Sequence, residues 1–398
     1  MQKILLPSHA WYGDTDMPLT FPENWDVDVM KFADLPVLTD DEMREALASP
    51  IGTPTISELA AGSKDAVIIV DDLSRPTPAG RILPHILDEL KAGGISESST
   101  LIVMAIGCHR QLTRPDLIRK LGEEIVNTVD VINSEPDDHL VSLGKTSRGT
   151  PILVNKFVME CDLKIGVGGI YQHPAMSFGG GAKIILPGVT GYETTRHNHH
   201  ELKGGDHAGN IDNDQRLDTE EVARKAGLNV IVNAIINSKR EVVKLFAGDM
   251  IEAHRKGVEF ARQAYATPVS TDADVVIANA YPLDVSLQHA GKGKWPFKYV
   301  RDGAIKIITT AASEGYGYHR LYARERRVIR ERTLDNSDLV LFSPNLTANE
   351  AYRNFPMGAI FFNSWDRLMD EVAPRCGNGN VKVAIYPCAT IQCPQVEE

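Results

Sequence analysis

The sequence predicts an α/β protein of two domains, with mostly parallel sheets flanked by helices. Its 398 residues exceed what one hydrophobic core usually organises. Its short β-branched runs are apolar throughout rather than alternating, which is typical of strands that helices cover on both faces. Helical patterns separate these runs, and such alternation of strand and helix favours parallel sheets.

Each predicted strand is a short apolar run, and each predicted helix lies between two such runs. We expect strands at Ala66–Asp71, Leu101–Ile106, Leu163–Gly168, Asn229–Ile236, Ala273–Ala278, Ile305–Thr310, Asp338–Phe342 and Val381–Tyr386. We expect helices at Gly80–Ala92, Arg114–Leu121, Ile251–Ala264, Asn345–Arg353 and Ser364–Val372. A new strand begins after ATPVST at 266–271, so we predict domains at 1–267 and 268–398, with the last residues as candidates to pack back on the first domain.

Composition narrows the classes of partner. Lys and Arg number 42 and Asp and Glu 53, a net charge of −11. Proteins that bind a nucleic-acid backbone carry basic patches, so we expect no nucleic-acid partner, although a local Arg or Lys cluster suffices for a small anion. No apolar run approaches the roughly 18 residues of a membrane helix, and the N-terminal one is too short for a signal peptide. With five scattered cysteines, this favours a reduced, cytoplasmic protein without a membrane span.

The first polar motif directly follows the strand Ala66–Asp71. It reads DDLSRPTP at 71–78 and lies at the carboxyl end of a strand, where open α/β sheets bind ligands. Arg75 can donate two parallel hydrogen bonds to a carboxylate or a phosphate, and Asp72 can accept one from a ribose hydroxyl. A turn with a solvated Arg–Asp pair is the alternative.

The second motif is GCHR at 107–110, where the strand Leu101–Ile106 ends. Gly107 permits close approach to the backbone. His109 can act as an acid or a base near neutral pH. A histidine in a purely structural role is the alternative.

The third motif follows the strand Leu163–Gly168 and begins with His173, which also lies beyond a strand end. A glycine run comes next: Gly179, Gly180 and Gly181. Such a run suits backbone N–H groups that approach an anion. Lys183 is then either a counter-charge for a phosphate or a nucleophilic amine that bonds to a cofactor.

A histidine cluster, HNHH at 197–200, closes this motif. His199 is our candidate metal ligand, since a neutral imidazole nitrogen binds many transition metals. A solvated loop rich in histidine is the alternative. Considered together, His109 and His173 suggest two proton-transfer positions on opposite faces of a substrate, as the inversion of a stereocentre requires.

These segments resemble the nickel-pincer-dependent lactate racemase family of 2-hydroxyacid racemases and epimerases. The matching segments are DDLSRPTP at 71–78, GCHR at 107–110, the stretch from His173 through GGGAK to the LPG that ends at 188, and Asn198–His199. A weaker match is YPLDVSLQHAGKG at 281–293. The segments keep the family order over most of the chain.

The resemblance implies a cofactor that other proteins assemble. It is nickel held by pyridinium-3,5-bisthiocarboxylic acid mononucleotide, the nickel-pincer nucleotide, bonded covalently to Lys183. His199 is implied to ligate the nickel. We expect Asp72 and the glycine run to contact this cofactor. The implied fold has two α/β domains, the first with the cofactor loops and the second with substrate-binding residues, and the active site in the cleft between them.

The resemblance also implies the reaction. His109 and His173 would act as alternating acid and base while the C2 hydride of a small 2-hydroxyacid moves to the cofactor and back. Arg75 and Lys292 would bind the substrate. The chain departs from the family at Gln288 and His289, where lactate racemase has tyrosine and glutamine, so we expect a more polar substrate, such as a sugar acid or a dicarboxylic hydroxyacid.

Two other functions stay open at this point. One is a metal-dependent hydrolase or lyase that uses the histidine cluster. The other is a catalytically inactive carrier of a nucleotide cofactor, since the changes at Gln288 and His289 leave room for a lost reaction.

Overall fold

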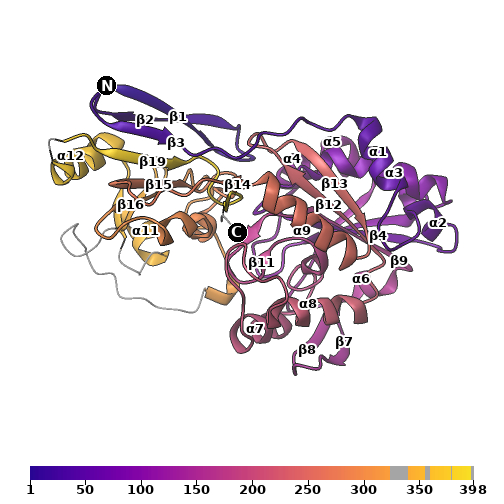
Figure 1. The fold of residues 1–398 in the computed structure, drawn as a ribbon. Coiled ribbons are helices and arrows are strands. Elements are labelled where there is room, and N and C mark those ends of the chain that lie inside the picture. Colours follow the sequence, from indigo (N-terminus) through magenta and orange to yellow (C-terminus); the bar gives the residue numbers. More distant parts are fainter. Residues whose placement is uncertain (323–338, 355–358, 378, 396–398) are drawn as a thin grey trace. The chain divides into compact units, whose positions relative to one another are not determined.

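The computed structural model describes residues 1–322, 339–354, 359–377 and 379–395 (Figure 1). The chain divides into two compact units, a central unit of residues 34–264 and a terminal unit that joins residues 1–33 to 265–398. The division at 264/265 lies near the predicted boundary at 267. Residues 1–33, which we predicted in the N-terminal domain, instead belong to the terminal unit, because β3 (Asp26–Val29) pairs with β19 (Lys382–Tyr386).

The central unit is built on a sheet with strand order β13-β12-β9-β4-β5-β6. All neighbours are parallel except β13, which runs antiparallel to β12 at the edge. Every residue of β4, β9 and β12 is buried, which explains why their sequences are mostly apolar on both faces. The strands are β4 (Ala66–Asp71), β5 (Thr100–Ala105), β6 (Asp130–Asn133), β9 (Leu163–Gly169), β12 (Val230–Ile236) and β13 (Val242–Gly248).

Helices of this unit begin at recognisable caps. α4 follows Thr113, whose N–H and hydroxyl both donate to Asp116, and Pro115 occupies its first turn, where a missing N–H costs nothing. The helices are α1 (Asp40–Ala48), α2 (Ile56–Ala60), α3 (Ala79–Ala92), α4 (Arg114–Leu121), α5 (Glu123–Thr128), α6 (Lys156–Glu160), α7 (Tyr192–Glu201), α8 (Asp214–Lys225) and α9 (Glu252–Ala264). α1 and α9 pack against β13 (Figure 1).

Two small hairpins complete the central unit. β7 (Leu140–Lys145) pairs with β8 (Pro151–Asn155), and β10 (Gln172–His173) pairs with β11 (Ser177–Phe178). The second hairpin carries His173 and leads into the glycine run, so a strand pair, and not an open loop, positions both.

The terminal unit is built on a parallel sheet with strand order β18-β17-β16-β15-β19-β3. Its other strands are β15 (Val275–Asn279), β16 (Ile305–Thr309), β17 (Leu339–Phe342) and β18 (Ile360–Phe362). Shorter pairs are β1 (Gln2–Ser8) with β2 (Thr15–Phe21), and β14 (Ala266–Thr267) with β20 (Cys393–Pro394). The helices are α10 (Leu287–Ala290), α11 (Ala348–Asn354) and α12 (Trp365–Cys376).

The predicted architecture of mostly parallel sheets flanked by helices is confirmed. Most predicted elements match the structure within two residues at each end. α11 begins later than Asn345 because Thr347 caps it through Glu350, and α12 continues to Cys376. Asp338 of the predicted strand at 338–342 lies outside the described residues. No helix among the described residues has the length and apolarity to cross a membrane.

Candidate active site

The three polar motifs lie at the carboxyl ends of three neighbouring strands of the central unit. β5, β4 and β9 are adjacent, and their register pairs Asp71 with Ala105. A Cβ atom added at Gly169, where β9 ends, would lie 2.8 Å from Thr77 Oγ1. The loop that follows β4 therefore lies directly against the end of β9.

Asp72 and His109 join two of these loops. Asp72 Oδ2 lies 2.6 Å from His109 Nδ1, and Asp72 Oδ1 accepts hydrogen bonds from Ser74 N (3.1 Å) and Ser74 Oγ (2.5 Å). A carboxylate can accept a hydrogen bond here only if Nδ1 carries the proton. This contact therefore assigns the ring proton to Nδ1 and leaves Nε2 as the acceptor of the neutral ring. His109 is thus oriented as a base.

Asp72 is held in its charged form. Burial opposes its ionisation, but attraction to His109, with further contributions from Arg75 and Ser74, holds the pKa of Asp72 well below its usual range. Since both carboxylate oxygens accept from protein donors, the contacts favour an orienting role for Asp72 rather than the predicted contact with a ribose hydroxyl.

A buried lysine supports the same loop from α4. Lys120 Nζ lies 2.6 Å from Asp71 Oδ1 and donates to the carbonyls of Asp72 (3.0 Å) and Arg75 (3.1 Å). The Lys120 side chain is fully buried, so all its donors serve the protein. Arg75 itself is half-buried, and its Nη1 donates to Ser74 Oγ at 3.0 Å.

His173 is oriented in the opposite sense to His109. Its Nδ1 accepts hydrogen bonds from the N–H groups of Ala175 and Met176, both at 3.2 Å. An accepting Nδ1 assigns the proton of the neutral ring to Nε2. The central unit therefore holds one histidine ready to accept a proton at Nε2 and another that carries one there.

Lys183 lies on the short 3₁₀ helix η2 (Gly181–Ile184), next to His173 by way of Met176. Lys183 Nζ donates to Met176 Sδ at 3.2 Å, and the N–H of the same Met176 donates to His173. Burial lowers the pKa of the Lys183 amine well below its usual range, and the positive charges of Arg216 and Arg75 lower it further. The amine is therefore biased toward its neutral, nucleophilic form.

The glycine run is packed more tightly than an open anion cradle. Gly179 N–H donates to Tyr171 O (2.8 Å) and Gly181 N–H to Asn233 Oδ1 (2.7 Å). Gly180 and Gly181 both have positive φ, and a Cβ atom at Gly181 would lie 2.8 Å from His254 Cγ. The expectation that the run presents its N–H groups to an anion does not hold for Gly179 and Gly181, since packing and backbone conformation account for these residues.

His199 has the geometry of a metal ligand. Its Nδ1 lies 3.0 Å from Thr195 O one turn earlier in α7, and a carbonyl accepts only from Nδ1–H. The neutral ring then carries no proton on Nε2, which is the form in which an imidazole nitrogen can bind a metal, and a ring nitrogen anchored in this way is usual at metal sites. The neighbouring Asn198 is buried and donates to Asp218 Oδ2 (2.9 Å), which fixes α7 against α8.

The described residues contain no group of three or more His, Cys, Asp or Glu side chains arranged to hold a metal ion. His197 Nδ1 instead lies 2.9 Å from Thr150 Oγ1, and the side chain of His200 is exposed. The histidine cluster thus separates into side chains with different surroundings, of which His199 is the candidate ligand.

Comparison with known proteins now adds to this geometry. Residues 12–210, about half of the chain, match the family described as lactate racemase N-terminal domain. A lactate racemase from Lactiplantibacillus plantarum is 33% identical over 294 residues, which cover 71% of this chain and 69% of that protein. The chain belongs to the lactate racemase family. It is accordingly an enzyme of the isomerase class.

Further relatives agree with this assignment. A lactate racemase from Thermoanaerobacterium thermosaccharolyticum is 33% identical over 292 residues, 71% of this chain and 68% of that protein. The structure of the lactate racemase apoprotein from that organism superposes with a TM-score of 0.76 and 23% identity, covering 99% of this chain and all of that one. The structure of a protein from Thermotoga maritima superposes with a TM-score of 0.65 and 15% identity, covering 91% of this chain and all of that one. At these identities the two structures show the shared fold.

The remaining predicted residues of this racemase lie in the terminal unit. Gln288 and His289 lie on α10 and Lys292 on the following 3₁₀ helix, η3 (Gly291–Gly293). His289 is buried, with Nδ1 3.3 Å from Ser286 Oγ. The loop before α10 is anchored by Asp284, which is buried and accepts from the N–H groups of His9 (2.9 Å) and Ala10 (3.2 Å).

Sequence reasoning missed several residues that shape the racemase site. Met176, which bridges His173 and Lys183, gave no signal in the sequence. Lys120 had the sequence appearance of an ordinary polar residue on a surface helix, although its side chain is fully buried. Arg216 and His254 lie in helices far along the chain, so only the fold could bring them to the glycine run.

Proposed function

We propose that this racemase inverts C2 of a 2-hydroxyacid, with hydride transfer to and from a nickel-pincer nucleotide tethered to Lys183. His109 and His173 act as alternating acid and base. The opposite orientations of these two histidines support the proposal most directly, because His109 offers Nε2 as a proton acceptor and His173 offers an N–H at Nε2 as a hydrogen-bond donor. Family membership supports racemisation as the reaction.

The residues present fit such a cofactor. The amine of Lys183 is biased toward the neutral form, which is the form that can bond to it. His199 presents Nε2 as a single metal ligand. Because the described residues offer no cluster of three metal-ligating side chains, a metal bound here would take most of its ligands from the cofactor. This favours the pincer nucleotide over a hydrolase or lyase, whose zinc needs three protein ligands.

The protein's own groups then manage protons and orientation. When bound, the cofactor supplies the acceptor and donor of the C2 hydride. His109 Nε2 takes the hydroxyl proton, and the charged Asp72 stabilises the imidazolium that forms. His173 presents an N–H at Nε2 toward the substrate oxygen on the other face; as the acid it would act in the imidazolium form, so that loss of the Nε2 proton leaves the neutral ring. Arg75 pairs with the substrate carboxylate.

The far end of the substrate is assigned to Gln288, His289 and Lys292. An amide and an imidazole, both able to donate and accept hydrogen bonds, with a lysine one turn later, suit hydroxyls or a second carboxylate better than a methyl group. A sugar acid or a dicarboxylic hydroxyacid is therefore the proposed substrate class, and both should exceed lactate in kcat/KM.

The first experiment tests the cofactor. The protein is co-produced with the cofactor-assembly proteins, and its intact mass and nickel content are measured on one sample. We expect stoichiometric nickel and a mass increase that maps to Lys183; Lys183→Ala should lose the covalent adduct and the control Lys203→Ala should keep it. An unmodified, nickel-free chain from a host that loads a control racemase would contradict the assignment and favour a hydrolase, a lyase or an empty carrier.

The second experiment tests the acid and base. His109→Asn and His173→Asn should keep the mass increase and lose turnover by about 10²-fold or more. Full activity of either variant would rule out its assigned role. A loaded wild-type protein that racemises no member of a hydroxyacid panel would instead identify a cofactor carrier.

A further inference from the structure

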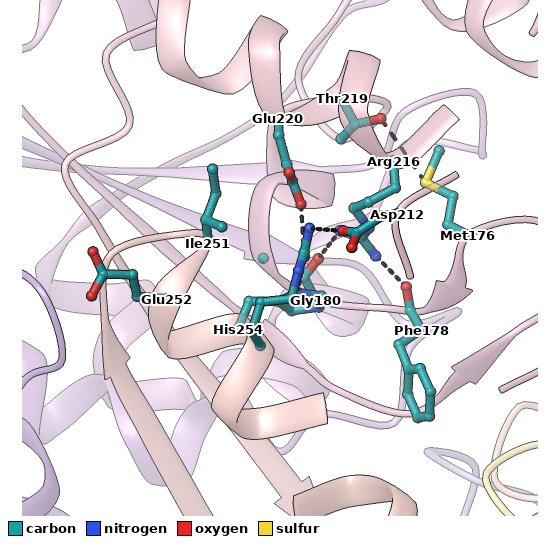
Figure 2. Close-up of polar contacts among 12 residues, drawn as sticks. Met176, Phe178, Gly180, Asp212, Arg216, Thr219, Glu220, Ile251, Glu252 and His254 are labelled. Carbon is teal, nitrogen blue, oxygen red and sulfur yellow. Dashed lines mark hydrogen bonds and ion pairs between the residues drawn. The ribbon is translucent and has the colours of Figure 1, made fainter. Parts of the chain in front are cut away.

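Three consecutive carbonyls of the loop that leads to Lys183 accept hydrogen bonds from buried side chains. Arg216 Nη2 donates to Phe178 O, and Arg216 Nη1 donates to Gly180 O at 3.1 Å. His254 Nε2 donates to Gly179 O at 2.8 Å. Figure 2 shows the Arg216 guanidinium between α8 and this loop, with one nitrogen on each carbonyl. α8 and α9 thus hold the loop at every residue from 178 to 180.

Burial of the Arg216 guanidinium carries a large desolvation cost. Arg216 is fully buried, and a buried cation is stable only when charge and hydrogen bonds compensate for lost water. Burial lowers its pKa to about 10 while Glu220 opposes that change, so the guanidinium stays charged at neutral pH. Glu220 in turn pairs with Arg255 at 2.8 Å, and Arg255 pairs with Asp212 at 2.9 Å.

A second connection runs from the same helix to the amine. Thr219, less than one turn after Arg216 on α8, donates its hydroxyl proton to Gln215 O at 2.8 Å and packs its Oγ1 3.9 Å from Met176 Sδ. Met176 Sδ in turn accepts from Lys183 Nζ at 3.2 Å. α8 therefore acts on the backbone that carries Lys183 and on the side chain that receives its amine.

We propose that Arg216 is a positioning residue for Lys183: its buried guanidinium fixes the 178–180 loop through two carbonyls and so sets the place of the Lys183 amine. The inference rests on the proposed function only in that Lys183 is taken as the tether. Nothing in the role requires the cofactor to be bound, so it can be tested on the apoprotein.

The charges that face Lys183 come from several elements. Arg216 faces it from α8, Arg75 from the loop after β4, and the neutral His254 from α9. Both arginines disfavour a further positive charge, and burial acts in the same direction. The charge of Arg255 is paired with Glu220 and Asp212, and its Nη1 also lies 3.3 Å from His254 Nδ1. Arg255 is thus a control for the loss of a nearby charge, and not for the contacts of the loop.

The test is competitive labelling of the full-length apoprotein with acetic anhydride from pH 6 to 10, read by peptide mass spectrometry, with the exposed Lys91 as internal reference. In wild type, Lys183 should react with a midpoint below that of Lys91. In Arg216→Met the midpoint should rise by about one pH unit, because one nearby cation is lost. In Arg255→Met it should stay as in wild type.

Hydrogen exchange separates the mechanical role from the charge. Arg216→Lys keeps the charge but cannot donate to both carbonyls as a planar fork, so its labelling midpoint should stay low. Amide exchange of the peptide at 177–183 should nevertheless accelerate about tenfold relative to wild type. The exchange measurement on Arg216→Lys also tests the positioning role if Arg216→Met does not fold.

Several outcomes would overturn the proposal. They are an unchanged midpoint in Arg216→Met, unchanged exchange in Arg216→Lys, or no reaction of Lys183 in wild type while Lys91 reacts. Failure of the tether is a separate result. If Lys183→Ala still acquired the cofactor covalently, the proposed function would fail while the labelling and exchange results would stand.

Discussion

Asp72 Oδ2 and His109 Nδ1 lie 2.6 Å apart and join the ends of two neighbouring parallel strands, β4 and β5. The contact fixes three properties of His109 together: the direction of its ring, its tautomer, and a negative charge beside the imidazolium that forms when Nε2 takes a proton. A base with these properties loses little freedom when it reacts, which is how preorganised sites lower a barrier.

Asp72→Asn should therefore act through His109. The amide keeps the size of the side chain but removes the charge and can select the wrong tautomer. We expect kcat to fall by about 10²-fold or more, while the mass increase at Lys183 and the fold are kept. The measurement is the initial rate of racemisation of the best substrate by loaded protein.

The double variant provides the control for this interpretation. In a His109→Asn background, Asp72→Asn should cause no further loss, because two residues that act as a unit are not additive. A full additional loss in the double variant would mean that Asp72 acts independently of His109.

Gly181 should tolerate alanine worse than another glycine with positive φ. Gly227, after α8, has a φ of +75° and no atom within 4 Å of an added Cβ, so Gly227→Ala should cost about 1 kcal/mol for backbone strain alone. At Gly181, with φ of +61°, the Cβ would also push His254 away, so we expect about 2–4 kcal/mol. Urea unfolding followed by circular dichroism measures both, and equal costs would refute the packing account.

The predicted strands were reliable because strands buried on both faces are mostly apolar at successive positions, as in β4, β9 and β12. The motifs at their ends were equally visible. Since parallel strands expose their carboxyl ends at one edge, the sequence alone is enough to predict that Asp72, His109 and the start of the third motif lie near one another.

The supporting residues could not be found in the same way. Arg216 is fully buried on a helix whose sequence is strongly polar, and Lys120 is buried on another. Composition assigns such side chains to the surface. The segment 1–33 was misassigned for a related reason, since the pairing of β3 with β19 joins residues more than 350 positions apart, as in Asp26 with Lys382, and has no local signature.

Lys120 should prove essential to the stability of the central unit. Its removal in Lys120→Met leaves the Asp71 carboxylate buried without its cation and orphans the carbonyls of Asp72 and Arg75. We expect a loss of about 3–5 kcal/mol in the free energy of unfolding. The exposed Lys91→Met on α3 serves as the control. Adding Asp71→Asn to Lys120→Met should recover part of the lost free energy of unfolding. A double variant that is less stable than Lys120→Met would count against an ion pair as the origin of the loss.

Asp284 should make the stability of the terminal unit depend on pH. Burial raises the pKa of Asp284 to about 6, against 3.8 in the unfolded chain, despite the hydrogen bonds from His9 and Ala10. Below both values the carboxyl is protonated in both states and its contribution is fully present. As pH rises through the window from 4 to 6, the unfolded chain releases the proton first, so stability falls, by roughly 3 kcal/mol in total.

Tryptophan fluorescence can follow this effect selectively, because all four tryptophans (Trp11, Trp25, Trp295 and Trp365) belong to the terminal unit. Urea unfolding at intervals from pH 4 to 7 should show the decline in wild type and a flatter profile in Asp284→Asn. The exposed Asp370→Asn on α12 should follow wild type. An Asp284→Asn profile that keeps the full decline would show that another group titrates, since an amide cannot release a proton in this range.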